Sequence, residues 1–271
     1  MTTAQAHYDR LLATHYTWML GGDIHAVARD QAALLQKLGI RPGADGDTAI
    51  DLGSGPGPQT LALAHLGFST VTAVDLSRAL LDELVEHAGT AGFSGALRTV
   101  LADLLDALPH VAGSGTAAAI VCMGDTLTHL PSPADVRSLL DSVACALRPG
   151  GHFVVTFRDL TGELRGDDRF FPVRCTEGQL LTCFVEYVDD DTVMVHDLLH
   201  SRSEGEWRLQ VGSYPKLRLA SDWLSGEARR AGLQVRHAAA GPRGMRILHA
   251  IKPPEGDSSP TSSARTAAGV T

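Results

Sequence analysis

The chain has 271 residues, of which 44% are hydrophobic and 20% charged, and its formal net charge is −8 at pH 7. This composition is typical of a globular protein with one large domain and a sizeable core. The negative net charge argues against a nucleic-acid-binding role, which normally needs a clustered basic face. The N-terminus shows no secretory signal, and no apolar run approaches the ~18 residues of a membrane span. We therefore expect a cytoplasmic protein without a nucleic-acid or membrane partner.

The four cysteines are Cys122, Cys145, Cys175 and Cys183, and they form no Cys-x-x-Cys pair and no metal-ligand spacing with histidine. In a cytoplasmic chain they are expected to be free thiols. The sequence therefore predicts no metal site.

The first part of the chain is predicted to be helical. Apolar and aromatic residues recur at helical spacing over residues 5–20, and Gly21-Gly22 breaks that pattern. Asp23 is placed to cap a second helix that runs to about Leu38. We expect residues 1–47 to form a helical lid.

The middle of the chain alternates between apolar runs and helical patterns. The predicted strands lie at residues 48–52, 70–76, 98–104, 115–125 and 152–158. Helices are expected from the glycine turn to Leu66, after Ser77 as the cap, and from Pro133 to Leu147. Nearly all-apolar strands that alternate with helices are typical of a parallel, right-handed βαβ sheet covered on both faces.

After this region the hydrophobic period changes to two. Residues 180–188, 192–201 and 206–214 predict a three-stranded antiparallel meander. A helix at 221–231 and two last strands follow, and these strands should form an antiparallel hairpin on the sheet edge. We expect a core of residues 48–159 and 218–252, a β insert of residues 160–217 over the active site, and a disordered tail of residues 253–271.

A glycine-rich turn follows the first strand. Gly53, Gly55 and Gly57 open a helix, whose N-terminus favours polar or anionic ligand groups. Asp75 ends the second strand and suits the hydroxyls of a ribose, and Asp103 at the end of the third strand suits the amine of an adenine. The alternative is that the glycines only make a tight turn and the two acids only cap helices. Agreement among three neighbouring strand ends favours a nucleoside site.

The spacing of the turn distinguishes between cofactors. Dinucleotide-binding turns follow the pattern GxGxxG, whereas this turn reads GSGPG after Asp51. It resembles the first motif of the class I S-adenosylmethionine-dependent methyltransferases, and the similarity continues through Asp75, Asp103 and the segment LRPGGHFVVTF at 147–157. The segment MGDTLTHLPSPADV at 123–136 is also similar to the glycine N-methyltransferase-like branch, from which it departs at Asp125-Thr126.

The resemblance implies a Rossmann-like α/β fold with a seven-stranded, mostly parallel sheet and S-adenosyl-L-methionine as the cofactor. It implies that Gly53 and Gly55 approach the methionine part, Asp75 the ribose and Asp103 the adenine. Three N-terminal aromatic residues could close over the cofactor or could simply pack on the core. The full set of predicted cofactor-binding residues is Tyr8, Tyr16, Trp18, Asp51, Gly53, Gly55, Gly57, Asp75, Leu76, Asp103, Leu104 and Met123.

The acceptor site is predicted from polar residues beyond the fourth and fifth strands and on the insert. His129 is the candidate general base, because its side chain titrates near neutrality, but it could equally bind a loop carbonyl. Asp125 is the second candidate catalytic residue and could hold a substrate amine or cap a turn. The predicted substrate pocket contains Thr126, Arg158, Tyr187, His200 and Tyr214.

The sequence thus predicts transfer of a methyl group to nitrogen or oxygen of a small molecule. Two other classes stay open at this point: a nicotinamide-dependent oxidoreductase and a non-catalytic S-adenosylmethionine-binding protein. A thiol-dependent methyltransferase would need cysteines at the pocket, and Cys175 with Cys183 are the only pair available. A homodimer is also left open.

Overall fold

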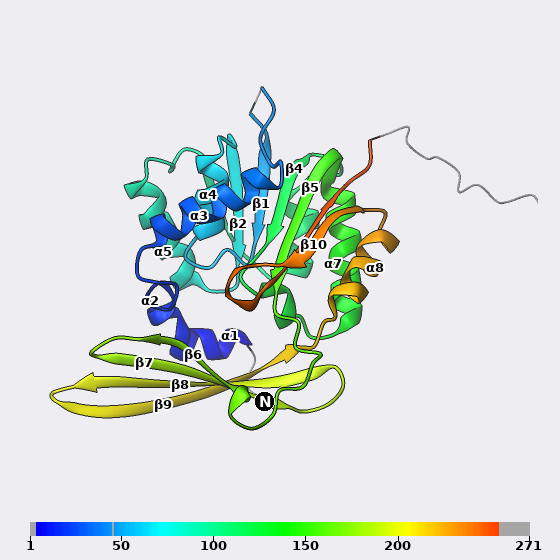
Figure 1. Ribbon diagram of the computed structural model, residues 1–271. Coiled ribbons are helices and arrows are strands. Elements are labelled where there is room, and N and C mark those ends of the chain that lie inside the picture. Colours follow the sequence, from blue (N-terminus) through cyan, green and yellow to red (C-terminus); the bar gives the residue numbers. More distant parts are fainter. Residues whose placement is uncertain (1–3, 45, 255–271) are drawn as a thin grey trace, which may run out of the picture.

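The protein is described by a computed structural model that covers residues 4–44 and 46–254. It contains a seven-stranded sheet of order β10-β11-β5-β4-β1-β2-β3 and a separate four-stranded sheet of order β6-β7-β8-β9 (Figure 1). The strands of the large sheet are β1 (Thr48–Leu52), β2 (Thr70–Asp75), β3 (Leu97–Leu101), β4 (Ala117–Cys122), β5 (Leu147–Phe157), β10 (Gln234–Ala240) and β11 (Arg246–Ile251).

The large sheet has the predicted topology. Strands β3, β2, β1, β4 and β5 run parallel, whereas β11 pairs antiparallel with β5 and with β10. Every residue of β4 is buried, as expected for a central strand with helices on both faces. The predicted Rossmann-like α/β fold with a C-terminal antiparallel hairpin is therefore confirmed.

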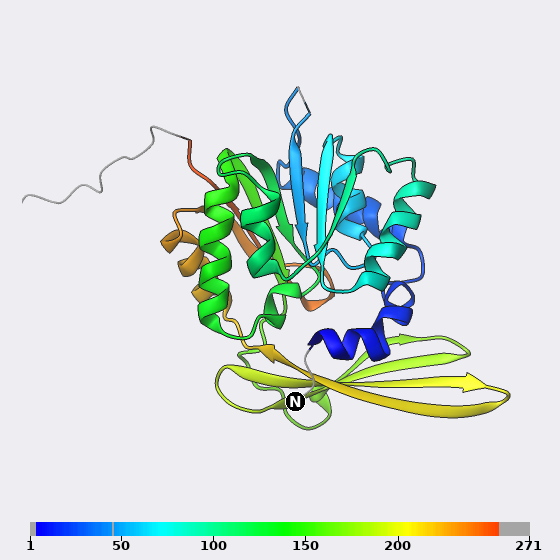
Figure 2. The ribbon, with the colours of Figure 1, turned by 180° about the vertical axis from the view of Figure 1, so that it is seen from behind.

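Helices cover both faces of this sheet (Figures 1 and 2). They are α3 (Ile24–Lys37), α4 (Pro58–His65), α5 (Arg78–Thr90), α6 (Leu104–Val111), α7 (Pro133–Ala146) and α8 (Ser221–Arg230). Ile120 of β4 packs in the core beneath α6, α7 and α8, and its neighbour Val121 packs beneath α3 and α4. Side chains that alternate along one strand thus contribute to two separate cores, one on each face of the sheet.

The third strand is shorter than predicted. We expected it to span 98–104, but β3 ends at Leu101 because Asp103 caps α6, and its Oδ1 accepts a hydrogen bond from the N–H of Leu105 (2.9 Å). The sequence analysis did not predict α6 as a helix.

The N-terminal segment is helical but irregular. It comprises α1 (Ala4–His7), a π-helical turn (Tyr8–Leu12), a 3-10 turn (Ala13–His15) and α2 (Tyr16–Met19), rather than one regular helix. It lies between the carboxyl edge of the large sheet and the four-stranded sheet (Figures 1 and 2).

The insert contains four strands, so the prediction of a three-stranded meander was wrong by one strand. They are β6 (Phe170–Cys175), β7 (Gln179–Tyr187), β8 (Thr192–Ser203) and β9 (Glu206–Leu217). The missed strand, β6, lies at the edge of the sheet and contains Pro172, which interrupts the pattern by which strands are recognised.

Within residues 4–44 and 46–254, no helix is both long and apolar enough to cross a membrane. Among the same residues, no group of three or more His, Cys, Asp or Glu side chains is placed to hold a metal ion. The four cysteines are free thiols. The predicted disordered tail lies outside the described residues from residue 255 onward.

Candidate functional site

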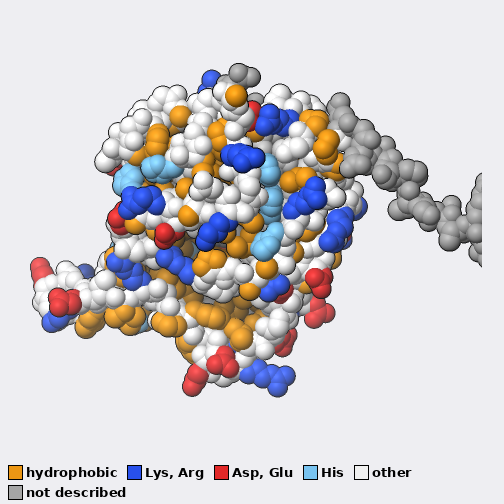
Figure 3. Space-filling view, turned by 45° about the horizontal axis from the view of Figure 1, so that its top comes forward, with side chains coloured by type: hydrophobic (Ala, Val, Ile, Leu, Met, Phe, Trp, Pro, Cys, Tyr) orange, Lys and Arg blue, Asp and Glu red, His pale blue; other side chains and the backbone are white. Residues whose placement is uncertain are grey.

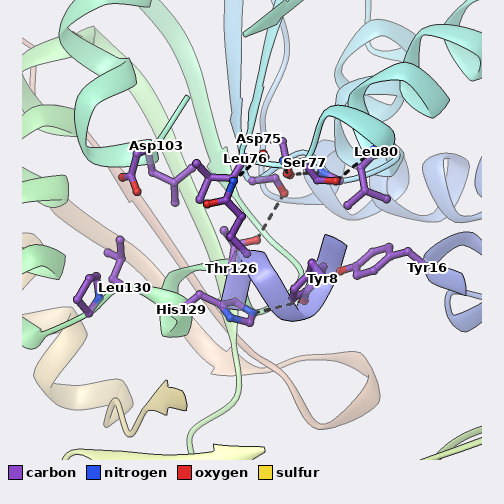
Figure 4. Close-up of a pocket in the computed structure, with 15 residues that line it drawn as sticks. Tyr8, Tyr16, Asp75, Leu76, Ser77, Leu80, Asp103, Thr126, His129 and Leu130 are labelled. Atoms are coloured by element: carbon purple, nitrogen blue, oxygen red, sulfur yellow. Dashed lines mark hydrogen bonds between the residues drawn. The ribbon is translucent and has the colours of Figure 1, made fainter. Parts of the chain in front are cut away.

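A cavity of about 330 Å³ opens at the carboxyl ends of β1, β2 and β4, beneath the N-terminal segment (Figure 4). Its walls come from that segment, the glycine turn, the loops after β2 and β3, and the turn after β4. The lining residues are Gln5, Tyr8, Tyr16, Gly53, Gly55, Asp75, Leu76, Ser77, Leu80, Asp103, Leu104, Thr126, His129, Leu130 and Pro131.

The three glycines of the turn serve different purposes. All three have positive φ angles, which glycine tolerates best. A Cβ on Gly53 would overlap the side chain of Thr126, and a Cβ on Gly57 would overlap that of Leu84. At Gly55 a Cβ would make only an ordinary van der Waals contact with Cε1 of Tyr16, at 3.6 Å, and the glycine lines both cavities. Two glycines are therefore needed for packing within the protein, and Gly55 is required mainly by its positive φ.

Asp75 lies at the end of β2 and shapes the turn. Its Oδ2 accepts a hydrogen bond from the N–H of Gly55 (2.8 Å), and its Oδ1 accepts one from the N–H of Ser77 (2.9 Å). A carboxylate oxygen can accept more than one hydrogen bond, so these contacts leave room for ligand hydroxyls. The geometry suits the ribose contact that the sequence predicts.

The lining of the cavity includes the apolar side chains of Leu76, Leu80 and Leu104. Asp103 lies beyond Leu76 from Leu80 (Figure 4). Asp103 caps α6 through Oδ1 and also lines the cavity, so its roles as a helix cap and as a lining residue are compatible. An apolar slot beside one carboxylate suits a purine ring that carries an exocyclic amine.

Asp51 supports the turn from below and does not line the cavity. It is fully buried, and its Oδ2 accepts a hydrogen bond from Thr60 Oγ1 (2.6 Å). Burial raises the pKa of Asp51 to about 7. Its Oδ1 has no partner among the described residues.

Two tyrosines of the N-terminal segment roof the cavity. The rings of Tyr8 and Tyr16 lie 5.7 Å apart, and burial raises the pKa of both hydroxyls, that of Tyr16 to about 12. They therefore stay protonated near neutral pH. Trp18 does not line the cavity, because its ring lies against the guanidinium of Arg174.

His129 faces Tyr8 across the cavity (Figure 4). A hydrogen bond of 3.5 Å joins Tyr8 OH and His129 Nε2, and the imidazole stacks on Tyr214 with ring centroids 5.3 Å apart. Burial, aided by the charge of Lys216, lowers the pKa of His129 to about 3. The imidazole is therefore neutral at physiological pH and can accept a hydrogen bond, but it is a weak base.

Asp125 is held by partners within the protein. Its backbone is left-handed (φ 75°) and leads into the turn η3 (Thr126–His129). Its Oδ1 accepts hydrogen bonds from the N–H of Arg158 (2.8 Å) and from Thr128 Oγ1 (3.1 Å), and its Oδ2 forms a buried ion pair with Lys216 of β9. Burial alone would raise the pKa of Asp125, but Lys216 and these hydrogen bonds outweigh it and lower the pKa. The amine that Asp125 holds is thus an internal lysine.

The sequence analysis missed a second buried pair, formed by His7 and Asp197. His7 Nε2 lies 2.8 Å from Asp197 Oδ2, and both side chains are almost fully buried. The His7 ring also stacks on Tyr214, and a Cβ on Gly212 would overlap it. Lys216, Asp197 and Tyr214 share one face of the insert by strand alternation, which is the sequence signal that could have revealed both pairs.

Several other predicted site residues lie away from the cavity. Tyr187 OH donates to the carbonyl of Gly162, so this tyrosine fastens a loop. The guanidinium of Arg158 donates to the carbonyl of Arg243. His200 alternates with the buried Leu199 of β8 and therefore points to the outer face of the insert. For these three residues a direct role in the substrate pocket does not fit the geometry.

A second cavity, of about 530 Å³, lies on the other side of the glycine turn, against α3. It shares Tyr16, Gly53 and Gly55 with the first cavity and is also lined by Met123. Two of its lining atoms, Ser54 Oγ and Gln31 Oε1, are buried without a partner among the described residues. Unpartnered polar atoms beside a glycine turn are the features expected where a polar ligand binds.

The comparisons with known proteins agree with this geometry. Residues 49–151 match the family described as "Methyltransferase domain". The ubiquinone biosynthesis O-methyltransferase of Methylococcus capsulatus is 30% identical over 152 residues, which are 56% of this chain and 59% of that protein. The glycine/sarcosine N-methyltransferase of Halorhodospira halochloris is 32% identical over 145 residues, which are 52% of this chain and 51% of that protein. The chain thus matches little more than half the length of these relatives.

A solved structure extends the likeness in fold to most of the chain. The amino pentose methyltransferase from Micromonospora echinaspora, solved with S-adenosylmethionine bound, superposes with a TM-score of 0.68 at 17% identity, over 88% of this chain and 95% of that one. The fold and the site together define a Rossmann-like methyltransferase domain. Residues 49–151 thus form a methyltransferase domain, in agreement with the resemblance to the class I S-adenosylmethionine-dependent methyltransferases.

The buried Asp51 predicts a measurable pH dependence of stability. The unfolded chain loses this proton near its ordinary pKa of 3.8, whereas the folded protein keeps it until about pH 7, so the free energy of unfolding falls as pH rises between these values. Asp51→Asn removes this loss. We expect the stability of the variant relative to the parent to grow by up to about 1.4 kcal/mol per pH unit across this window. Urea denaturation of both proteins at several pH values measures it, and a difference independent of pH would contradict the assignment.

Proposed function

We propose that this protein transfers a methyl group from S-adenosyl-L-methionine to nitrogen or oxygen of a small-molecule acceptor. The observation that carries the proposal is the first cavity, where Gly55, Asp75 and Asp103 line one side and Tyr8, Tyr16 and His129 face them. These residues offer a nucleoside site and, beside it, an enclosed place for a second molecule.

The residues present fit the cofactor. Asp103 and Leu104 suit the adenine, Asp75 the ribose, and the backbone of Gly53 and Gly55, which lines both cavities, the amino-acid end. When bound, the cofactor supplies a methyl group on a positively charged sulfur that a nucleophile can displace. The orphaned Ser54 Oγ and Gln31 Oε1 lie in the cavity beyond the turn, where a charged ammonium or carboxylate would satisfy them.

The protein's contribution to the reaction is mainly orientation and exclusion of water. Tyr8 and Tyr16 cover the strand ends, and the insert supports them through the contacts of His7 with Asp197 and Tyr214, so that the acceptor is held in one orientation. Alignment of two reactants can contribute as much as about 7–11 kcal/mol to lowering the barrier. A cavity closed in this way fits a small acceptor and not a nucleic acid.

His129 and Tyr8 are placed to position the acceptor. The neutral imidazole accepts a hydrogen bond from Tyr8 or from a hydroxyl or amine of the acceptor. This hydrogen bond orients the lone pair of the nucleophile toward the methyl group. An uncharged amine needs no base before attack, and its extra proton leaves afterwards. A hydroxyl acceptor gains less from a base this weak, so the site favours nitrogen.

The arrangement of the chain supports a lid and an insert. We propose that residues 1–47 act as the lid, residues 48–159 and 218–252 as the methyltransferase core, and residues 160–217 as an insert that completes the acceptor site. The cytoplasmic location stays a prediction.

The alternatives differ in what binds. A nicotinamide-dependent oxidoreductase would bind NADH, and a non-catalytic binding protein would bind S-adenosylhomocysteine without turning over any acceptor. A thiol-dependent reaction is poorly supported, since neither Cys175 nor Cys183 lines either cavity.

Asp75→Asn tests the cofactor site. It removes a charge-assisted acceptor of ribose hydroxyls, so we expect S-adenosylhomocysteine to bind at least tenfold more weakly by calorimetry, a loss of about 1.4 kcal/mol or more. Asp82→Asn is the control, because Asp82 is exposed on α5. Binding of NADH by the parent protein, or unchanged affinity in the variant, would contradict the proposal.

His129→Ala tests the acceptor site. We expect turnover to fall about 10²-fold, as for a misplaced reactant, while affinity for S-adenosylhomocysteine changes less than about threefold. Because the pKa of His129 is about 3, its titration should leave the pH profile of kcat flat between about pH 5 and 8. Turnover measured with labelled cofactor, alongside calorimetry, separates these effects. Equal losses of turnover and of affinity would reduce His129 to a packing residue.

We also propose that the protein forms a homodimer through the outer face of the insert. Trp207, Leu209 and Val211 of β9 are 51%, 52% and 55% exposed on that face, and such an apolar strip is typical of an interface. Sedimentation of the parent and of Leu209→Asp tests this proposal: we expect a dimer and a monomer respectively. A monomeric parent, or a dimer that survives the substitution, would refute it.

A further inference from the structure

The second cavity is larger than the cofactor requires. Adenine and ribose groups suit the first cavity, so only the short amino-acid end of the cofactor is left to occupy the junction at Tyr16, Gly53 and Gly55. Yet the second cavity measures about 530 Å³ and extends from this junction past Leu34 to Thr156 and Met245. This space can receive a second molecule next to the transferred methyl group.

Two cationic side chains line this extension. Lys37 ends α3, and Arg243 lies in the turn between β10 and β11. Asp30 of α3 is the acid that lines the same cavity. Figure 3 shows Lys and Arg side chains spread over the middle of this side of the molecule, although the net charge of the chain is −8. The cavity thus offers a net attraction for an anionic group.

Arg243 is held in an unfavourable backbone conformation. Its φ of 57° lies in the left-handed region, which is unfavourable for a residue with a side chain. Its carbonyl accepts a hydrogen bond from Arg158 Nη1 (2.9 Å), and the N–H of Met245 donates to the carbonyl of Pro242 (3.1 Å). The turn is therefore fixed with an arginine at the cavity wall, where glycine or asparagine would be less strained.

Two unpartnered polar atoms line the same cavity. Ser54 Oγ is buried without a partner among the described residues, and Ser54 itself is only 2% exposed. Gln31 Oε1 is likewise buried and unpartnered among them. A ligand that enters from the Arg243 side meets polar groups at the inner end and a cation at the outer end.

We propose that the acceptor extends from the first cavity into the second, and that the part in the second cavity carries an anionic group, a phosphate or a carboxylate, which pairs with Arg243 and is attracted by Lys37. A guanidinium binds either group through two parallel hydrogen bonds. The nucleophilic atom of the acceptor then lies at the junction of the two cavities. This inference rests on the proposed function and specifies its substrate class.

The test uses protein saturated with S-adenosylhomocysteine, probed with inorganic pyrophosphate and, separately, with succinate at constant ionic strength. We expect one of the two anions to raise the thermal unfolding temperature of the parent protein, since a ligand of the folded state stabilises it. Pyrophosphate identifies a phosphate-bearing acceptor and succinate a carboxylate-bearing one. Arg243→Gln should abolish at least half of the shift, and Lys37→Gln should reduce it less.

The matched control is Arg229→Gln, since Arg229 is an exposed arginine at the end of α8 that lines neither cavity. It should keep the full anion response. Calorimetry with S-adenosylhomocysteine should give the parent affinity, within about twofold, in all three variants.

Three outcomes would overturn the inference. The first is that neither anion stabilises the parent protein loaded with S-adenosylhomocysteine. The second is that the Arg229→Gln control loses the anion response as Arg243→Gln does. The third is that Arg243→Gln binds S-adenosylhomocysteine much more weakly than the parent. The last result would mean that the cation serves the cofactor's own carboxylate, and the proposed function would stand. Failure of the parent to bind S-adenosylhomocysteine would instead contradict the proposed function itself.

Discussion

The buried ion pair between Asp125 and Lys216 is the contact on which the site depends. It joins the loop after β4 to β9 of the insert, two elements that are 91 residues apart in sequence. Removing two charges from water is costly unless the pair is close and further hydrogen-bonded, as Asp125 is by Arg158 and Thr128. The pair therefore holds one arrangement of the turn that carries Thr126 and His129, and loss of either partner would leave a buried charge uncompensated.

The roof of the cavity depends on a second buried contact of the same kind. His7 pairs with Asp197 and stacks on Tyr214, which in turn stacks on His129. The N-terminal segment is thus anchored to the insert rather than to the large sheet alone. In a regular α-helix Tyr8 and Tyr16 would be about 12 Å apart along the axis, whereas the π-helical and 3-10 turns bring their ring centroids to 5.7 Å.

The two buried aspartates beside the glycine turn show how environment divides the roles of identical side chains. Among the described residues, no cation offsets the burial of Asp51, and burial raises its pKa to about 7. Asp125 is equally buried, but Lys216 and the surrounding hydrogen bonds lower its pKa. The first supports the turn from beneath and changes its charge near neutral pH, and the second is a permanent charge that organises the turn carrying Thr126 and His129.

The sequence by itself determined the parallel sheet, the glycine turn, and the carboxylates Asp75 and Asp103 at neighbouring strand ends. These features follow from hydrophobic period and from the rule that parallel strands end at one edge, so they need no knowledge of packing. The tertiary structure decided which side chains face the cavities and which do not: it paired Lys216 with Asp125 and Asp197 with His7 in the interior, kept His200 and Tyr187 out of both cavities, and packed Gly57 against Leu84. The physical reason is that such placements depend on how the faces of separately folded elements meet, which local sequence patterns do not encode.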